Sequence, residues 1–164
     1  MEALLDLLNS RPLVNGEEQD ALGDPAGGTR WAREHGGEGS PAELALLREA
    51  RDILRDVVKG ESPPTALSPL LEGVHQTPEL TSDGLRWKVN TPPHARLAVE
   101  MVLAWAATEK QLPGRLRPCA NDECQLFLLD RSRANRARWC SMAACGNREK
   151  ARRHYNRTHE QKGP

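Results

Sequence analysis

Residues 139–157 read WCSMAACGNREKARRHYNR and place two cysteines immediately before a dense run of positive charge. A second pair lies upstream, so the chain carries the pattern C-x4-C, fifteen residues, C-x4-C at Cys119, Cys124, Cys140 and Cys145. The residues before Cys119 contain no cysteine. Two closely spaced thiol pairs separated by a hairpin-length insert favour one tetrahedral zinc ion; disulfides, a redox pair or another metal such as iron are the alternatives.

The predicted zinc ion is structural, because four thiolates complete its coordination sphere and leave no position for water or substrate. Between the two pairs, the apolar residues 126–129 predict a short strand, and residues 136–139 are predicted to return beside it. Ser141 is a candidate N-cap for a helix that runs to about Thr158 and holds Cys145 in its first turns. This order of knuckle, hairpin and helix resembles a treble clef.

The net charge of zero hides two oppositely charged parts. Residues 115–164 contain 12 Lys and Arg against 5 Asp and Glu, a net charge of +7, whereas residues 1–114 contain 11 against 18, a net charge of −7. Such a division indicates a basic part that meets a polyanion and an acidic part that does not. The alternative is a chance imbalance between two solvated surfaces.

About forty residues around the cysteines carry a resemblance to a known family. The positions concerned are Cys119, Ala120, Asn121, Cys124, Phe127, Asp130, Ser132, Arg133, Arg136, Arg138, Trp139, Cys140, Ser141, Met142, Cys145, Gly146, Asn147, Arg148, Lys150 and Arg152. They resemble the CGNR zinc-finger family, named for the tetrapeptide at residues 145–148. In that family the finger follows an N-terminal helical domain called ABATE. Residues 4–10 of this chain (LLDLLNS) resemble the opening segment of that domain, although more weakly. The resemblance implies a stress-linked bacterial transcription regulator.

Charge and resemblance together predict a surface that binds nucleic acid, in the first place duplex DNA. The candidate contacts are Arg133, Arg136, Arg138, Arg148, Lys150, Arg152, Arg153 and Arg157. Their cations would neutralise phosphates, and a few side chains that reach base edges would supply any sequence preference. Arg148 follows a ligand cysteine closely, so it has the alternative role of stabilising the knuckle. A structured RNA or a protein is the alternative partner.

The break at Pro113 and Gly114 divides the chain into an N-terminal body, residues 1–114, and the finger, residues 115–164. The predicted fold class is mainly α with small β-hairpins. The short linker implies two packed units with limited freedom between them.

Periodicity and caps predict the elements of the body. A capping box that starts at Ser40 begins a helix that ends near Lys59, and a more hydrophobic helix spans about residues 92–111. Residues 73–90 predict a hairpin that turns near Asp83. Core anchors are expected at Trp31, Trp87 and Trp105.

Asp6 and Asn9 lie at i, i+3 in an apolar segment and are candidates for contacting a small-molecule effector. The alternative is that they satisfy backbone groups at a helix end. The body is interpreted as a sensor or dimerisation unit, which makes a homodimer a candidate assembly. In another interpretation, the finger only completes the fold of a small-molecule-binding protein.

Neither catalysis nor membrane insertion is predicted. The five histidines have no metal-ligand spacing, and the chain carries neither a phosphate-binding glycine loop nor a nucleophile elbow. It also has no long apolar run and no leader-like segment, so the expected location is the cytoplasm, without a membrane partner.

Overall fold

The computed structural model describes residues 1–14 and 16–160. Along them, the elements are α1 (Glu2–Leu8), β1 (Leu13–Val14), β2 (Glu17–Glu18), α2 (Pro25–Glu34), α3 (Pro41–Lys59), the 3-10 helix η1 (Pro64–Leu71), β3 (His75–Thr81), β4 (Gly84–Asn90), α4 (Pro93–Gln111), β5 (Leu116–Pro118), β6 (Phe127–Leu129), the π-helical turn η2 (Met142–Gly146) and α5 (Asn147–Glu160). The strands pair antiparallel as β1–β2, β3–β4 and β5–β6. The protein is therefore mainly α with small hairpins, as predicted.

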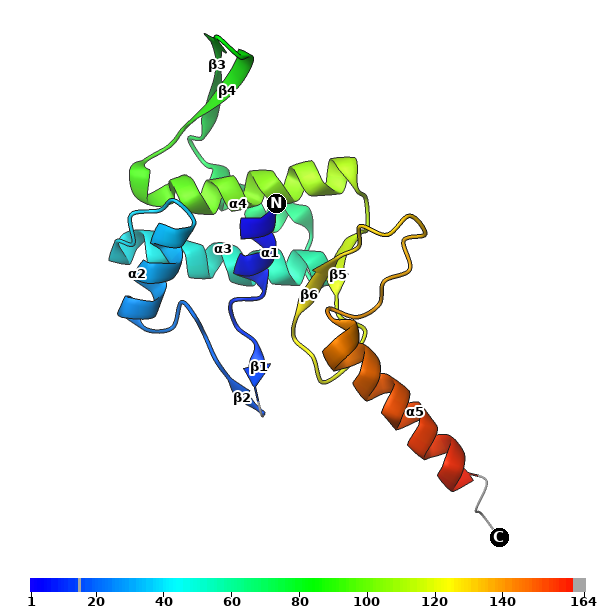
Figure 1. Ribbon diagram of the computed structural model, residues 1–164. Helices are drawn as coiled ribbons and strands as arrows, with labels where there is room; N and C mark the ends of the chain where they lie inside the picture. The colour runs from blue at the N-terminus through cyan, green and yellow to red at the C-terminus, as the bar shows by residue number, and fades with distance from the viewer. Residues whose placement is uncertain (15, 161–164) are drawn as a thin grey trace.

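Two long helices, α3 and α4, form the frame of the body. At the start of α3, the Ser40 side chain accepts a hydrogen bond from the Glu43 N–H, and Pro41 occupies the first helical position. The helix ends at Gly60, whose φ of 78° suits glycine. Figure 1 shows α4 running alongside α3, with α1 packed against both. Both predicted long helices are confirmed to within about a residue at each end.

The apolar core fills the space between these helices. Leu7 of α1, Leu47 and Leu54 of α3, and Leu97 of α4 are fully buried. Full burial of one such leucine contributes about 2 kcal/mol relative to exposure. Because each helix supplies several of these side chains, their packing fixes α1, α3 and α4 against one another.

The finger shares this core through its two strands. Leu116 on β5 and Phe127 on β6 are buried within the same apolar cluster as the leucines of the helices. Arg55 of α3 donates from Nη2 to the Gln125 carbonyl oxygen at 3.1 Å, and its guanidinium carbon lies 5.0 Å from the centre of the Phe127 ring. Apolar and polar contacts therefore hold β5 and β6 against α3.

The strand predicted at residues 136–139 is wrong, because this segment is irregular. β6 instead pairs with β5, so that Leu116 lies opposite Leu129. The turn between these two strands carries the first cysteine pair. The buried carboxylate of Asp130 accepts hydrogen bonds from the N–H groups of Ser132 and Ala137, each at 2.8 Å. These bonds close the segment after β6 into a loop and occupy an N–H that a strand ladder would have used.

The predicted hairpin is confirmed, but it stands away from the body (Figure 1). The ladder runs from the His75–Asn90 pair to the Thr81–Gly84 pair. Trp87 in β4 is 58% exposed, so the expectation that it anchors the core is wrong. The alternating pattern identified the strands correctly, whereas none of the sheets or helices in the described residues covers the face on which Trp87 lies.

Among the described helices, none combines the length and apolar character that crossing a bilayer requires.

Candidate metal centre and nucleic-acid interface

The four cysteine side chains converge on one point. All four Sγ atoms lie within 4.8 Å of one another, and Cys140 Sγ lies 3.7 Å from Cys124 Sγ and 3.6 Å from Cys145 Sγ. A disulfide would require about 2.05 Å between sulfurs. A zinc ion with Zn–S bonds of about 2.3 Å requires sulfurs about 3.8 Å apart. The cysteines are therefore free thiols whose spacing fits one zinc ion.

The turn between β5 and β6 holds the first cysteine pair. The Cys119 N–H donates to the Leu126 carbonyl oxygen, and the Cys124 N–H donates to the Asn121 carbonyl oxygen, each at 2.8 Å. The buried Asn121 side chain donates from Nδ2 to Cys145 Sγ at 3.5 Å, while the Cys140 N–H donates to Cys119 Sγ at 3.4 Å. Donors aimed at sulfur stabilise thiolates and orient metal ligands.

The second cysteine pair brackets the entry to the C-terminal helix. Ser141 Oγ accepts a hydrogen bond from the Ala144 N–H at 3.4 Å and caps η2, as predicted from the sequence. η2 buries Cys145 and continues directly into α5. A Cβ at Gly146 would lie 2.9 Å from both Sδ and Cε of Met142, so glycine permits this close approach.

The thiols differ in their tendency to ionise. Burial raises the pKa of Cys124 to about 11, and burial together with the neighbouring thiols raises the pKa of Cys140 as well. Burial acts in the same direction on Cys145, but hydrogen bonds from Asn121 and the other cysteines outweigh it and lower its pKa. Since metal ligation requires thiolates, binding a cation here releases protons.

The geometry of the centre explains the tetrapeptide at residues 145–148, because each of its four residues has a separate role there. Cys145 supplies a sulfur, Gly146 allows close packing, and Asn147 Nδ2 donates to the Ala143 carbonyl oxygen at 3.3 Å. Arg148 Nη1 lies 3.8 Å from Glu123 Oε2 in the turn that holds the first cysteine pair. Residues 115–158 match the CGNR zinc-finger family. No curated protein matches the chain.

Within the CGNR finger, Asp130 fixes the loop that carries the arginines. Arg117 Nη2 donates to Asp130 Oδ2 at 2.6 Å and also to the Ala137 carbonyl oxygen at 2.7 Å. Hydrogen bonds from the side chain and N–H of Ser132 and from the Ala137 N–H, together with the charge of Arg117, outweigh burial and lower the pKa of Asp130 to about 2. The carboxylate is therefore ionised at neutral pH and holds both ends of the loop.

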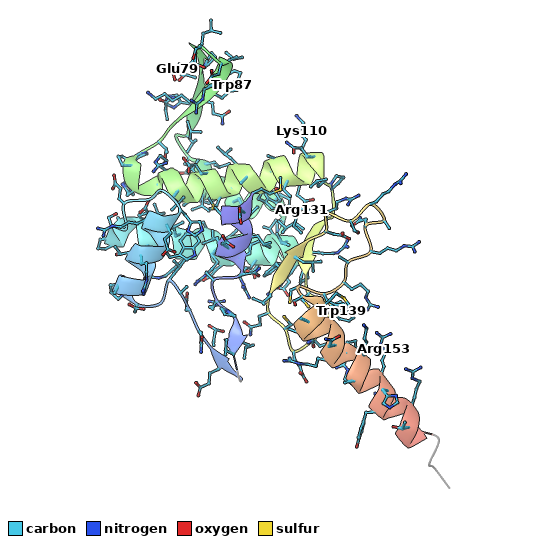
Figure 2. The ribbon with its side chains drawn as sticks, in the orientation of Figure 1. Glu79, Trp87, Lys110, Arg131, Trp139 and Arg153 are labelled. Atoms are coloured by element: carbon cyan, nitrogen blue, oxygen red, sulfur yellow. The ribbon has the colours of Figure 1, made fainter. Side chains whose placement is uncertain are left out.

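The loop after Asp130 exposes several predicted phosphate contacts. Arg133, Arg136 and Arg138 are solvent-exposed, and the Arg138 guanidinium carbon lies 5.1 Å from the centre of the Trp139 ring. Arg136 and Arg138 line a groove of about 500 Å³ between the loop and β5. Figure 2 shows long side chains with nitrogen at their tips extending outward from this end of the molecule.

Helix α5 carries the remaining predicted contacts, and one carboxylate neutralises two of them in part. Arg152 Nη2 lies 2.8 Å from Glu149 Oε2, and Arg153 Nε lies 3.7 Å from Glu149 Oε1. Lys150 is exposed, and no carboxylate among the described residues lies within ion-pairing distance of it. Arg157 donates from Nε to the Arg153 carbonyl oxygen at 3.3 Å. Lys150 is thus a more available cation than Arg152 or Arg153.

The two candidate ligand residues, Asp6 in α1 and Asn9 directly after its last residue, have different partners. Asn9 lies at the junction with the finger, where Nδ2 donates to the Phe127 carbonyl oxygen at 3.2 Å and Oδ1 accepts from the Phe127 N–H at 2.7 Å. Asp6 Oδ2 lies 3.3 Å from His35 Nε2. Asn9 therefore bonds backbone groups of a strand, and the two side chains do not share a site.

Sequence reasoning missed an ion pair beside this junction that joins the buried Arg51 to the partly buried Asp20. Arg51 of α3 is 1% exposed and donates to both oxygens of Asp20, at 2.6 and 2.9 Å, and to Ser10 Oγ at 3.0 Å. Its position between Leu47 and Leu54 on the apolar stripe is a signal that could have indicated burial. Arg55 follows one turn later and donates to the carbonyl oxygens of Leu8 and Gln125. These arginines fasten α3 to the segments around it.

Proposed function

We propose that this protein binds nucleic acid in a zinc-dependent manner, that its partner is duplex DNA, and that it regulates transcription. The observation that carries the proposal is the attachment of two basic surfaces, the loop at residues 131–138 and α5, to one four-cysteine centre. The centre fixes the start of α5 through Cys145 and the end of the loop through Cys140. Zinc would supply structural rigidity, while arginines and lysines neutralise phosphates.

The dimensions of α5 support a duplex partner. Its 14 residues span about 21 Å, and a helix with its side chains is about 10–12 Å wide. The major groove of B-DNA is about 12 Å wide and admits such a helix. Figure 1 shows α5 pointing away from the body, and residues 150–158 are exposed to solvent and so open to a partner.

Fluorescence anisotropy of a labelled duplex with zinc-loaded protein, measured across a salt series, tests the proposal. We expect affinity to fall steeply with salt, because each neutralised phosphate contributes a slope of about −0.9 to the log–log plot. The double variant Lys150→Gln, Arg157→Gln should flatten that slope by about 2 units if both cations contact phosphates.

The matched control is Arg86→Gln, Lys88→Gln on the distant hairpin, which removes the same charge from exposed positions of β4. It should retain the wild-type slope. Equal slopes for the α5 variant and the wild type would exclude α5 as the contact surface. Failure of the intact protein to bind at low salt would reject a nucleic-acid partner, and preference for an RNA competitor would redirect the proposal to RNA.

A second candidate function has its own support in the shared core. Because Leu116 and Phe127 pack among the helices, the finger could serve only to complete the fold of a protein with another partner. Zinc removal would then change stability, while DNA affinity would be absent with or without zinc. Under the proposed function, chelation weakens DNA binding as well as stability.

A further inference from the structure

The β3–β4 hairpin presents one apolar face without a partner among the described residues. Directly paired residues of an antiparallel ladder lie on the same face. The register pairs Pro78 with Trp87 and Leu80 with Leu85, so these four side chains form an apolar stripe. Leu80 is 84% exposed, Leu85 57% and Trp87 58%. The face thus exposes large apolar side chains that water solvates poorly.

The other face of the hairpin is polar. It carries the Glu79–Arg86 pair and the Thr77–Lys88 pair, both exposed. An isolated two-stranded hairpin is only marginally stable in water, and three strands or packing on another element are generally needed. Figure 2 shows Glu79 and Trp87 on this hairpin, which projects beyond α4. A ladder of this length, displayed in this way, indicates that a partner covers the apolar face.

Both edges of the hairpin disfavour the addition of a further strand. Pro78 near the middle of β3 has no N–H to donate, and proline is typical of strand edges that remain unpaired. Lys88 in β4 is exposed, and lysine has the same effect at an edge. The partner is therefore expected to pack on the face of the hairpin rather than extend its sheet.

We propose that the partner is a second copy of this chain, and that the two apolar stripes pack face to face about a two-fold axis. Residues 74–90 contain Glu79, Asp83, Arg86 and Lys88, a net charge of zero, so two hairpins approach without net repulsion. Because the charged pair lies on the opposite face, it stays solvated when the stripes meet. A two-fold arrangement places the same patch on both sides of the interface.

The area of the stripe sets the strength of this dimer. Leu80, Leu85 and Trp87 together expose roughly 350 Å² of apolar surface, on the basis of ordinary leucine and tryptophan areas. Two copies would bury roughly 700 Å², less than the roughly 1,200 Å² of a stable interface. The dimer is therefore weak and concentration-dependent, and simultaneous binding of both fingers to DNA would strengthen it.

Sedimentation velocity of the zinc-loaded full chain from about 5 to about 500 µM tests the dimer, because weak interfaces dissociate in that range. The wild type should shift from monomer to dimer, and its tryptophan emission should move to shorter wavelength as Trp87 is covered. Leu80→Thr, Trp87→Thr should remain monomeric, as should Leu85→Arg, which retains Trp87. Lys88→Thr on the opposite face is the matched control and should associate like the wild type.

A monomer at every concentration would overturn the proposal, as would unchanged association in Leu80→Thr, Trp87→Thr and in Leu85→Arg. An emission shift that appears only with vesicles of phosphatidylcholine and phosphatidylglycerol would assign the stripe to a lipid surface and also overturn it. The measurement contains no nucleic acid, so its failure is distinguishable from failure of the proposed DNA binding.

Discussion

At the scale of single residues, Asn9 joins the first helix to the finger. Its amide both donates to and accepts from the backbone of Phe127, in the way that a residue of a neighbouring strand would. One side chain therefore satisfies both polar groups of a residue whose own side chain is buried in the shared core.

Replacing Asn9 by alanine should lower the free energy of unfolding by about 2 kcal/mol, because two hydrogen bonds are lost and the Phe127 N–H and carbonyl are left without those partners. Urea denaturation of the zinc-loaded protein measures the loss. Asp6→Asn, at a half-exposed position of α1, is the control and should change stability by less than about 0.5 kcal/mol. A fully stable Asn9→Ala variant would show that the junction does not depend on this amide.

Asp20 links stability to pH through its contact with Arg51. Burial alone would raise the pKa of Asp20, but hydrogen bonds from Arg51 and the Leu22 N–H, together with the charges of Arg51 and Arg11, hold it below its ordinary value. The stability that this carboxylate contributes is therefore present above its unfolded pKa of about 4 and disappears as pH falls through the lower folded value.

Asp20→Asn should destabilise the protein by about 3 kcal/mol at pH 7, because it leaves the buried Arg51 without its main counterion. The difference between the variant and the wild type should shrink as pH falls below about 4. Both proteins lose zinc in acid, and the effect of that loss on the free energy of unfolding cancels when the variant is compared with the wild type at the same pH. Urea titrations at a series of pH values provide the measurement, with Asp83→Asn in the exposed hairpin turn as control. A difference that is constant down to pH 2.5 would contradict the assignment.

Sequence reasoning identified residues whose partners are local and missed those whose partners are distant. The four cysteines were predicted because two closely spaced thiol pairs favour one tetrahedral zinc ion over disulfides or another metal, and the four sulfur atoms do converge. Asn9 was recognised as a polar group in an apolar segment, but its partner lies 118 residues away. Arg51 and Arg55 were not recognised as buried, because charged residues are buried only when distant groups pair with them.

At the scale of elements, Glu149 determines how many cationic side chains of α5 are available to a phosphate. Its carboxylate contacts both Arg152 and Arg153, and its side chain is only 15% exposed beneath them. A phosphate has to compete with this carboxylate for either guanidinium.

Glu149→Gln should therefore raise DNA affinity by about two- to fivefold at low salt, the range expected from releasing guanidinium groups that are themselves about half exposed. Anisotropy titrations measure the gain. Glu79→Gln on the hairpin makes the same change in charge far from α5 and should leave affinity within error. Equal gains in the two variants would mean that total charge, and not the release of Arg152 and Arg153, determines binding.

Cys145 connects the metal centre to the same helix. Cys145→Ser removes a buried sulfur and its contact with Asn121, so bound zinc should fall from one per chain to nearly none. Elemental analysis of the purified protein measures this. Ala143→Ser, which adds a hydroxyl at an exposed position of the same turn, should keep one zinc per chain. Stoichiometric zinc in Cys145→Ser would reject the four-cysteine assignment.

Elements with a local cause were predicted well. The Ser40 cap, the Gly60 stop and the turn near Asp83 each follow from backbone preferences within a few residues. The return strand at residues 136–139 was wrong because the sequence does not reveal that Asp130 accepts hydrogen bonds from its own loop. β5 was not predicted, since its three residues carry too little pattern.

At the scale of the whole molecule, loss of zinc and unfolding of the helical core are expected to occur together. Leu116 and Phe127 lie in the apolar cluster of α1, α3 and α4, so loss of the finger would open that core to water. The division into body and finger therefore stays a prediction from charge and chain order, whereas the packing joins the two parts in one apolar core.

Chelation should lower the melting temperature of the whole chain in one transition. A ligand present at about a thousand times its Kd contributes about 4 kcal/mol, which corresponds to about 10 °C for a chain of this size. Calorimetry with and without EDTA measures the shift. Two separate transitions, of which only one responds to EDTA, would show that body and finger are thermodynamically independent.

The bond between Asn9 and Phe127 also has a consequence for biosynthesis. The ribosome completes α1 long before residue 127 exists, and at about 5–20 residues per second the intervening 118 residues take about 6 to 24 seconds. During that interval the nascent helices have an unfinished core, with the places of Leu116 and Phe127 unfilled. Native packing therefore awaits the last third of the chain, and we expect a chain truncated before the finger to expose the apolar surface that Leu116 and Phe127 would cover.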